Sequence, residues 1–485
     1  MQTYEKLFIG GDWVAPTGTG TIGVISPHTE EIVGRVPDGT TADIDRAVGA
    51  ARAAFDHGPW PKMSGNERAD IMAALNGILQ QRSEELAVTI TTEMGSPISF
   101  SRLGQTMAAS MVLDYYTGLA RQFAFEDLRP GMLGPALVRR EAVGVVGAIV
   151  PWNVPLFVIM LKLGPALAAG ATVVLKPAPE TPLDAMLLAE AIQAAGVPPG
   201  VVNIVAAGRE VGEHLVTHPD VDKISFTGST AAGKRIAMLC GERLKRVTLE
   251  LGGKSAAIIL DDADLSQVIP GLLPAAMMNT GQACAAQTRI LASRKRYDAV
   301  VESLVAIVRD VKTGDPMEPD TFCGPLVASR QRDRVEGYIR SGRQEGAHIA
   351  IGGGRPSWAK RGWYVEPTVF SGVDNSMRIA REEIFGPVVV VIPYDDEADA
   401  IRIANDSDYG LSGTVWTNDI EHGIDVARQV RTGTYTVNGF AMEFSAPFGG
   451  YKCSGLGREL GPEGLSAYLE SKTINLPMGY EPRPQ

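Results

Sequence analysis

The chain has 485 residues and 45% hydrophobic content, enough to bury more than one core and to form about two to four domains. Its formal net charge is -11. This acidic balance argues against nucleic acid or an anionic membrane as a partner, because both would require a basic face.

The N-terminal segment MQTYEKLFIGGDW has no uninterrupted apolar run and carries Glu5 and Lys6 early. A secretory signal is therefore not expected, and we predict a cytoplasmic protein. The runs KLFIGGDWV, TIGVISP and EIVGRVP predict hairpins at the start of the chain. Residues 41–122 are predicted to be mostly helical, and Ser64 with Glu67 forms a capping box before the periodic run IMAALNGILQ.

No charged residue occurs between Glu141 and Lys162, which meets a crude test for a membrane span. However, Pro151, Asn153 and Pro155 divide this stretch into two short apolar pieces. A buried strand, a tight turn and a helix explain it better than a membrane helix.

From 143 to 250 short β-rich runs alternate with helical segments: VGVVGAIV, ATVVLKP, VVNIVAA, DKISFTG and RVTLELG. This alternation is typical of a parallel sheet wound with helices, in which ligands lie beyond the carboxyl ends of the strands. A second α/β region follows from about 253 to 450, with strands AAIIL, RILAS, VVVVIPY and GTVWT and a helix at 328–344. The Pro-rich tail NLPMGYEPRPQ is expected to be extended.

The stretch TGSTAAGKR, which begins at Thr227, reads like a phosphate-binding loop of the form G-x-x-x-x-G-K. The next residue should be Ser or Thr to hold magnesium, and it is Arg235. A loop of this kind between a strand and a helix can still offer N–H groups to a phosphate.

The four cysteines are widely spaced and form no C-x-x-C pair: Cys240, Cys284, Cys323 and Cys453. They indicate free thiols in a reducing compartment. His214 and His218 lie four residues apart, but neither an H-E-x-x-H motif nor a third ligand accompanies them, so no metal is expected. Cys284 in NTGQACAAQTR has small neighbours that leave room for a substrate, although an arbitrary cysteine is more often a small core residue.

Two further polar residues lie where catalysis is favoured. Glu250 ends the apolar run RVTLE beside two glycines, near the carboxyl edge of the predicted sheet, where it could activate water or a thiol. Asn153 lies between two prolines, and its amide could donate a hydrogen bond to a developing oxyanion. Taken singly, Glu250 could be a capping or ion-paired residue and Asn153 a polar turn.

Seven motifs together resemble the aldehyde dehydrogenase superfamily over essentially the whole chain. They are PWNVP, VLKPAPETP, FTGSTAAGK, LELGGKS, GQAC, EEIFGPV and PFGGYKCSG, in that family's order and at closely matching spacing. The resemblance implies an α/β fold with a Rossmann-like dinucleotide-binding domain (1–122 and 143–252), a second α/β catalytic domain (253–452) and a small β oligomerisation or bridging element (123–142 and 453–485).

The resemblance implies oxidation of an aldehyde to a carboxylic acid with NAD(P)+. Cys284 matches the nucleophile that forms a thiohemiacetal and then a thioester, and Asn153 matches an oxyanion donor. Glu250 matches the base that activates the water for hydrolysis. Lys162 and Glu459 match positions tied to proton escape or to support of the site.

The resemblance also implies the cofactor contacts. Ser229 matches a pyrophosphate contact at a helix N-terminus, Lys176 a ribose contact, and Glu383 and Phe385 contacts with the nicotinamide ribose and ring. The remaining implied contacts are Ile149, Pro151, Trp152, Gly208, Gly212, Phe226, Gly228 and Leu251.

One departure concerns the choice of cofactor. Many NAD-preferring members carry a Glu three residues after the ribose-binding Lys, and here Pro179 occupies that position with Glu180 next to it. Without this carboxylate, one barrier to the binding of NADP is removed. However, no added Arg or Lys that could bind the extra phosphate of NADP is found nearby in the sequence. We therefore expect NAD, with NADP left open.

The substrate and the assembly are implied less directly. Positions that are often aromatic in relatives are Val154 and Leu161 here, while Phe448 is retained, so medium or long apolar aldehydes are expected, including branched or terpenoid ones. The family pairs a projecting strand element with a neighbouring subunit, which implies a homodimer or a homotetramer.

Three other readings remain open at this point. A P-loop phosphotransferase is disfavoured by Arg235, and a CoA-acylating dehydrogenase is disfavoured by Glu250, which members of that type commonly lack. A catalytically silent binding protein on the same fold is disfavoured because Cys284, Glu250 and Asn153 are all present.

Overall fold

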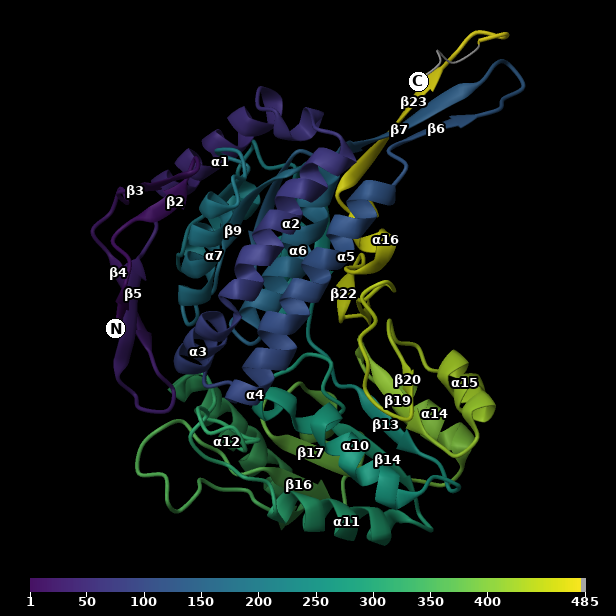
Figure 1. The fold of residues 1–485 in the computed structure, drawn as a ribbon. Helices are drawn as coiled ribbons and strands as arrows, with labels where there is room; N and C mark the ends of the chain where they lie inside the picture. Colours follow the sequence, from purple (N-terminus) through teal and green to yellow (C-terminus); the bar gives the residue numbers. More distant parts are fainter. Residues whose placement is uncertain (481–485) are drawn as a thin grey trace.

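Residues 1–480, described by a computed structural model, contain two large mixed sheets with flanking helices and a narrow β arm (Figure 1). The first sheet lies in the upper half of Figure 1, the second in the lower half, and the arm projects from the first. None of the helices within residues 1–480 is long and apolar enough to cross a membrane. The last residues of the Pro-rich tail, 481–485, lie outside the described part.

The first sheet has eight strands in the order β22-β12-β11-β8-β9-β10-β2-β3. Their bounds are β2 Leu7–Ile9, β3 Asp12–Val14, β8 Val145–Ile149, β9 Thr172–Lys176, β10 Val202–Ile204, β11 Lys223–Thr227, β12 Arg246–Glu250 and β22 Gly455–Leu456. The five strands predicted between residues 143 and 250 are all present and pair in parallel, which confirms the wound α/β pattern. The added edge strands β2, β3 and β22 run antiparallel to their neighbours.

Helices cover both faces of this sheet. They are α1 Thr41–Asp56, α2 Gly65–Gln81, α3 Ser83–Met94, α4 Ile98–Phe100, α5 Ala108–Gln122, α6 Pro155–Ala169, α7 Leu183–Ala194, α8 Arg209–Thr217, α9 Thr230–Glu242 and α16 Gly461–Ser466, with the short 3-10 turn η1 Trp60–Lys62 and the π-helix η2 Ser101–Met107. The predicted capping box is present, since Ser64 and Glu67 exchange hydrogen bonds at the start of α2.

The uncharged stretch before Lys162 forms β8, a turn and α6, as predicted. Pro155 is the first residue of α6, where its missing N–H costs nothing and its fixed φ suits the helix. Every residue of α6 is buried, because the helix lies between the sheet and the helices α2 and α5. This position explains the hydrophobicity of the segment without a membrane.

The second sheet has seven strands in the order β15-β16-β17-β14-β13-β19-β20. Their bounds are β13 Ala256–Ile259, β14 Arg289–Ser293, β15 His348–Ile351, β16 Thr368–Ser371, β17 Val388–Tyr394, β19 Gly413–Trp416 and β20 Thr436–Val437. Its helices are α10 Leu265–Met277, η3 Met278–Gly281, α11 Tyr297–Arg309, α12 Ser329–Gln344, α13 Arg378–Arg381, α14 Glu397–Asn405 and α15 Ile420–Gln429. The four strands and the helix predicted in this region are confirmed.

Two small sheets complete the body of the fold. Strands β1 Gln2–Thr3, β4 Thr21–Ile25 and β5 Ile32–Pro37 form one, and β18 Tyr409–Gly410 pairs with β21 Tyr451–Lys452 in the other. The antiparallel β4 and β5 form one of the predicted hairpins, and His28 lies in the turn between them.

The arm consists of β6 Glu126–Arg129, β7 Ala136–Ala142 and the C-terminal β23 Leu469–Asn475 (Figure 1). Met132 and Leu133, in the turn between β6 and β7, are 97% and 91% exposed. Residues 453–468, which the sequence assigned to the bridging element, lie elsewhere: β22 pairs with β12 and α16 packs on α6. The reason is that the backbone of Gly455 and Leu456 completes the edge of the first sheet, so only β23 extends into the arm.

Two carboxylic acids are buried together where α3 meets α7. Glu93 accepts hydrogen bonds from the backbone N–H groups of Leu183 and Asp184, at 2.9 and 3.1 Å. Neither oxygen of Asp184 has a hydrogen-bond partner among the described residues. Burial raises the pKa of Asp184 to about 8, and burial together with Asp184 raises that of Glu93. The fold therefore favours the protonated form of Asp184 at neutral pH.

Asp184→Asn should raise thermal stability, with an increment that grows with pH. The pKa of Asp184 is higher in the folded than in the unfolded protein. The contribution of Asp184 to the free energy of unfolding is therefore fully present below the unfolded pKa and is lost as the pH rises through about 8. The neutral amide does not titrate. We expect a Tm gain of a few degrees near pH 8 and a smaller one near pH 5. Melting curves of Asp184→Asn and of the exposed first-turn control Asp298→Asn test this, and an equal gain at both pH values contradicts it.

Candidate active site

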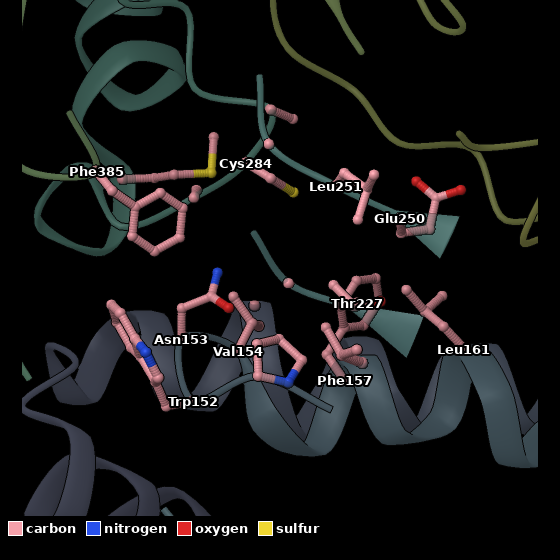
Figure 2. Close-up of a pocket in the computed structure, with 18 of the residues that line it drawn as sticks. Trp152, Asn153, Val154, Phe157, Leu161, Thr227, Glu250, Leu251, Cys284 and Phe385 are labelled. Atoms are coloured by element: carbon pink, nitrogen blue, oxygen red, sulfur yellow. The ribbon is translucent and has the colours of Figure 1, made fainter. Parts of the chain in front are cut away.

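A cavity of about 400 Å³ lies between the two large sheets (Figure 2). The carboxyl edge of the first sheet supplies Thr227 and Glu250, the last residues of β11 and β12. Cys284 comes from the loop before β14, and Phe385 from the loop before β17. The site is thus built from the carboxyl edge of one parallel sheet and the amino edge of the other.

Cys284 lies in a loop with an unusual backbone. Asn279 and Thr280 both have positive φ, 51° and 58°, and Gly281 has φ 70°. A Cβ at Gly281 would come within 2.1 Å of the Gly386 carbonyl oxygen, so only glycine fits there. The loop thereby packs tightly against the loop before β17 and presents the thiol to the cavity.

The Cys284 thiol is only partly accessible, and acidic groups surround it. Burial, and then the Glu383 and Glu250 carboxylates, raise its pKa to about 12. A thiolate is the nucleophilic form of cysteine, so this site needs positive charge or a base before the thiol can react.

Asn153 lies on the opposite wall from Cys284 (Figure 2). Its side-chain Nδ2 donates to the Gln282 carbonyl at 2.9 Å, and Asn279 Nδ2 donates back to the Asn153 carbonyl at 2.8 Å. These two hydrogen bonds join the turn after β8 to the cysteine loop. A primary amide has two N–H groups, so one N–H of Asn153 remains to donate into the cavity.

Glu250 faces the cavity without a hydrogen-bond partner for either oxygen among residues 1–480. Burial and the nearby Glu459 raise the pKa of Glu250 well above its ordinary value, and Lys162 and Arg458 offset part of this. A carboxyl group with a raised pKa is a better proton acceptor than a surface carboxylate.

Lys162 and Glu459 form an ion pair of 2.6 Å beside Glu250, and each side chain is 1% exposed. Lys162 also donates to Thr227 Oγ1 at 2.7 Å. Glu459 lines the cavity, whereas Lys162 lies behind it. The sequence-predicted catalytic residues are therefore brought together in one place.

Glu383 and Phe385 form the wall beside Trp152. Glu383 Oε1 accepts the backbone N–H of Gly253 at 3.0 Å, and burial raises the pKa of Glu383 to about 7. Phe385 has φ +64°, which is strained for a residue with a side chain, and its ring meets the Trp152 ring edge-on at 5.4 Å.

Two residues of α12 hold this strained loop, and neither was predicted from the sequence. Arg334 donates to the Glu383 carbonyl at 2.6 Å, and Gln331 donates to the Phe385 carbonyl at 2.7 Å. They lie three residues apart on the face of α12 that meets the cavity. Their spacing is a recognisable signal, but the loop that they contact is about fifty residues away in the sequence.

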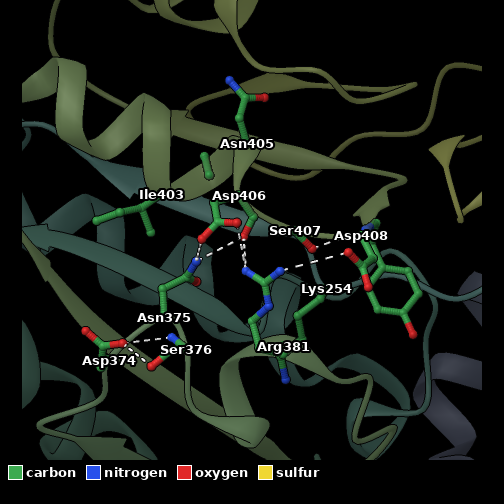
Figure 3. Close-up of polar contacts among 12 residues, drawn as sticks. Lys254, Asp374, Asn375, Ser376, Arg381, Ile403, Asn405, Asp406, Ser407 and Asp408 are labelled. Atoms are coloured by element: carbon green, nitrogen blue, oxygen red, sulfur yellow. Dashed lines mark hydrogen bonds and ion pairs between the residues drawn. The ribbon is translucent and has the colours of Figure 1, made fainter.

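The short helix α13, which directly precedes the Glu383 loop, is fixed by polar and charged residues (Figure 3). Arg381, at the end of α13, pairs with Asp406 at 3.0 Å and with Asp408 at 3.9 Å. Asn375 donates to Asp406 and accepts from the buried Arg289 at 3.0 Å. These contacts fix α13 to the end of α14.

A second group of predicted residues lies outside the cavity, at the carboxyl ends of β9 and β10. Lys176 Nζ donates to the Pro177 and Ala207 carbonyls at 3.0 and 2.8 Å, and burial lowers its pKa to about 8. An ammonium has three donors, so one is unused. A Cβ at Gly212 would approach Lys176 to 3.1 Å, so glycine leaves the lysine room.

Two helices begin at this edge of the first sheet, α8 after β10 and α9 after β11. Gly208 precedes α8 without a side-chain cap, and nothing lies within 4 Å of where its Cβ would be. Ser229 precedes α9, and its hydroxyl accepts the Ala232 N–H at 3.3 Å. Gly228 leaves space for the Phe226 ring, which a Cβ would approach to 2.5 Å. Such termini favour anions.

Most of the other predicted cofactor contacts line the cavity. Pro151, Leu251, Gly228 and Ser229 line the cavity, whereas Ile149 is a buried residue at the end of β8. Lys234 is exposed on α9, and Arg235 pairs with Glu213 on α8 at 2.6 Å. Glu180, next to Pro179, pairs with Arg330.

The remaining wall is apolar. Val154, Leu161 and Phe448 line the cavity, as predicted. Several other apolar residues of this wall were not predicted from the sequence, among them Phe100, Phe157, Met278, Phe440, Met442 and Phe444. The last three alternate with other residues in the run FAMEF, but this segment has no regular secondary structure that could have indicated where it lies.

Comparison with known proteins identifies the class. The model of the aldehyde dehydrogenase family matches residues 13–474. The chain therefore belongs to the aldehyde dehydrogenase family.

Two curated relatives cover almost the whole chain. It is 47% identical over 474 residues to a geranial dehydrogenase of Castellaniella defragrans, covering 98% of this chain and 99% of the relative. It is 45% identical over 486 residues to a 3-succinoylsemialdehyde-pyridine dehydrogenase of a Pseudomonas species, covering 99% and 100%.

Solved structures of two relatives have the same fold. An aldehyde dehydrogenase of Mycobacterium tuberculosis in complex with NAD+ superposes with a TM-score of 0.98 at 49% identity, covering 99% of each chain. A variant of aldehyde dehydrogenase C of Pseudomonas syringae in complex with NAD+ and octanal superposes with a TM-score of 0.95 at 43% identity, covering 97% of this chain and 96% of that one.

Glu383→Gln should make Cys284 more reactive. Removing this carboxylate removes the largest electrostatic contribution to the raised thiol pKa, so more thiolate is present at any pH below that value. We expect faster alkylation by iodoacetamide between about pH 7 and 9, where the rate is proportional to the thiolate fraction. Intact-mass measurement of the rate tests this, with Cys284→Ala to identify the modified residue. An unchanged or slower rate contradicts the electrostatic account.

Proposed function

We propose that this protein oxidises an apolar aldehyde to a carboxylic acid with NAD+, through a covalent intermediate on Cys284. The observation that carries the proposal is the single cavity shared by Cys284, Asn153 and Glu250, which offers a nucleophile, a hydrogen-bond donor and a base. Membership of the aldehyde dehydrogenase family supports it.

The residues at the carboxyl edge of the first sheet suit the binding of a dinucleotide. Two helix N-termini suit a pyrophosphate, and the unused donor of Lys176 and the carboxylate of Glu383 suit ribose hydroxyls. A bound NAD+ would supply the acceptor for the hydride of the aldehyde. The NAD+ complexes of two structural neighbours support this assignment.

In the first half of the reaction, Cys284 is the nucleophile. Its thiolate attacks the aldehyde carbon, and the carbonyl oxygen becomes an oxyanion. The free N–H of Asn153 and the backbone N–H of Cys284 stabilise this oxyanion, and loss of the hydride leaves a thioester on Cys284.

In the second half, Glu250 takes a proton from water as the oxygen attacks the thioester carbon. The tetrahedral species collapses, the carbon–sulfur bond breaks and the acid leaves. Glu250 lacks a hydrogen-bond partner among the described residues and is free to bind the water. Glu459, which is paired with Lys162, then accepts the proton, since this pair lies beside Glu250.

The apolar wall supports an apolar substrate of medium or long chain. Aromatic and aliphatic side chains from 154–161 and 440–448 leave few polar groups to recognise a charged aldehyde. A relative named for geranial, a branched terpenoid aldehyde, and a neighbour that holds octanal support the same class.

We further propose that the arm joins subunits into a homodimer or homotetramer. Its turn exposes Met132 and Leu133 almost fully, and Ile474 on β23 is also exposed. An apolar surface of this kind favours a protein partner.

Substitutions of the two chemical groups should separate the two half-reactions. Cys284→Ala should form no NADH from any aldehyde. Glu250→Gln should form about one NADH per subunit in a burst and then turn over at least about 10²-fold more slowly, because hydrolysis lacks its base. Stopped-flow absorbance at 340 nm measures both phases. NADH formation by Cys284→Ala at the wild-type rate would refute the mechanism.

A panel of aldehydes should reveal the substrate class and the cofactor. We expect kcat/KM for octanal and geranial to exceed that for betaine aldehyde by about tenfold or more, because a quaternary ammonium group finds no compensating charge in an apolar wall. NAD+ should be preferred over NADP+, and the panel is run with both because Pro179 replaces the usual acidic residue. A preference for betaine aldehyde would reject the apolar class.

A further inference from the structure

Two neighbouring strands carry polar side chains on a sheet face that is apolar elsewhere. These positions, the polar track, are Lys223, Ser225 and Thr227 on β11 and Arg246, Thr248 and Glu250 on β12. In the parallel register each residue of the first three lies beside one of the second three. The same face of β8, β9 and β10 is apolar and belongs to the largest core cluster. A parallel sheet covered on both faces is normally apolar throughout, so this polar face requires a reason.

The middle of the polar track is buried and hydrogen-bonded. Lys223 is 1% exposed, and its Nζ donates to Thr248 Oγ1 at 2.7 Å. Ser225 is fully buried and accepts a hydrogen bond of 3.0 Å from the hydroxyl of Tyr468. The Lys223 ammonium lies 4.9 Å from the centre of the Tyr468 ring. These groups form a cluster of donors and acceptors within the sheet.

One end of the polar track opens into the cavity that holds Cys284. Thr227, Glu250 and Glu459 all line that cavity. Thr227 accepts from Lys162 at 2.7 Å, and Lys162 pairs with Glu459. The proton-accepting groups of the proposed reaction therefore adjoin the track directly.

The other end lies at the surface. Arg246 pairs with Glu470 at 2.5 Å, and both side chains are about half exposed. In the strand register Lys223 lies directly beside Arg246, and Arg246, with a smaller contribution from Lys223, lowers the pKa of Glu470. Lys223 is thus the buried cation between the interior hydroxyls and the surface.

We propose that the polar track conducts the proton that Glu250 removes from water to the surface at Glu470, with Lys223 as the positioning residue that completes it. The inference rests on the proposed function, because only hydrolysis of the thioester produces this proton. It extends beyond Lys162 and Glu459 to the hydroxyls and the lysine that connect them to solvent.

The transfer is balanced at every step. One O–H bond of the attacking water breaks and its proton bonds to Glu250. This proton then passes to Glu459. Along the polar track, the Lys162 ammonium and each hydroxyl group release one proton for each proton that they receive. One proton is released at Glu470, all groups return to their starting state, and no electrons move.

The electrostatics of Lys223 are consistent with this role. Burial, and then the charge of Lys162, lower the pKa of Lys223 to about 7, so its ammonium and amine forms exchange readily at neutral pH. The titratable groups that face it are Lys162 on α6, Cys240 on α9, Arg246 on β12, and Glu459, Tyr468 and Glu470 from the C-terminal segment.

The test measures hydrolysis of the acyl-enzyme directly. Enzyme with NAD+ is mixed with less than one equivalent of octanal and quenched, and the thioester is followed by intact mass while NADH is followed by absorbance. Lys223→Met and Thr248→Val should slow thioester decay by about threefold or more in dilute buffer and leave the rate of NADH formation unchanged. A small diffusible base such as imidazole should restore the rate of decay.

A matched control distinguishes the track from structural damage. Thr172, a buried residue of β9 in the same sheet, donates to a backbone carbonyl at 3.0 Å and lies outside the track, so Thr172→Val should hydrolyse the thioester at the wild-type rate. Wild-type decay in both track variants, or equal slowing of NADH formation and decay without rescue by imidazole, would overturn the proposal. Failure of wild-type enzyme to form any thioester would instead overturn the proposed function itself.

Discussion

The candidate active site depends on one geometric constraint, the edge-to-edge meeting of two sheets whose central strands are parallel. The carboxyl edge of the first sheet delivers Glu250, and the amino edge of the second receives Cys284 and Glu383 in the loops before its strands. Neighbouring parallel strands end at the same edge of a sheet. Residues that are distant in the sequence therefore lie side by side along that edge. Because both edges border the same cavity, the thiol, the base and the loop that holds Phe385 share one enclosed space.

Enclosure changes the chemistry of the groups within it. Removal from water penalises charge, which raises the pKa of Cys284 and Glu383 and leaves Glu250 a stronger base than an exposed carboxylate. The same penalty explains why Lys162 and Glu459 occur as a close pair, since either charge alone would be costly to bury. Strain at Phe385 is tolerated because hydrogen bonds from α12 hold the loop on both sides of it.

Local patterns predicted much of this fold. Short β-rich runs between helical segments predicted the five strands up to residue 250 and four strands after it. The prolines in the uncharged stretch before Lys162 predicted that it forms a strand, a turn and a helix. Cys284, Glu250 and Asn153 were readable because each lies in a motif with small or turn-forming neighbours. The apolar wall from 440 to 444 was not readable, since a segment without regular structure has no period from which to infer what it faces. The pairing of β22 with β12 was missed for a related reason, because two residues of edge strand carry almost no pattern.

The sequence by itself therefore determined the fold class, the family and the candidate reactive residues, because periodicity and short motifs act over a few neighbouring positions. Only the tertiary structure decided what surrounds those residues. The contact of Gln331 with Phe385 and the alignment of Lys223 and Thr248 beneath Glu250 depend on strand register and helix packing between distant segments. Burial and electrostatic coupling also follow from that packing, so the pKa shifts that control the chemistry are properties of the folded chain.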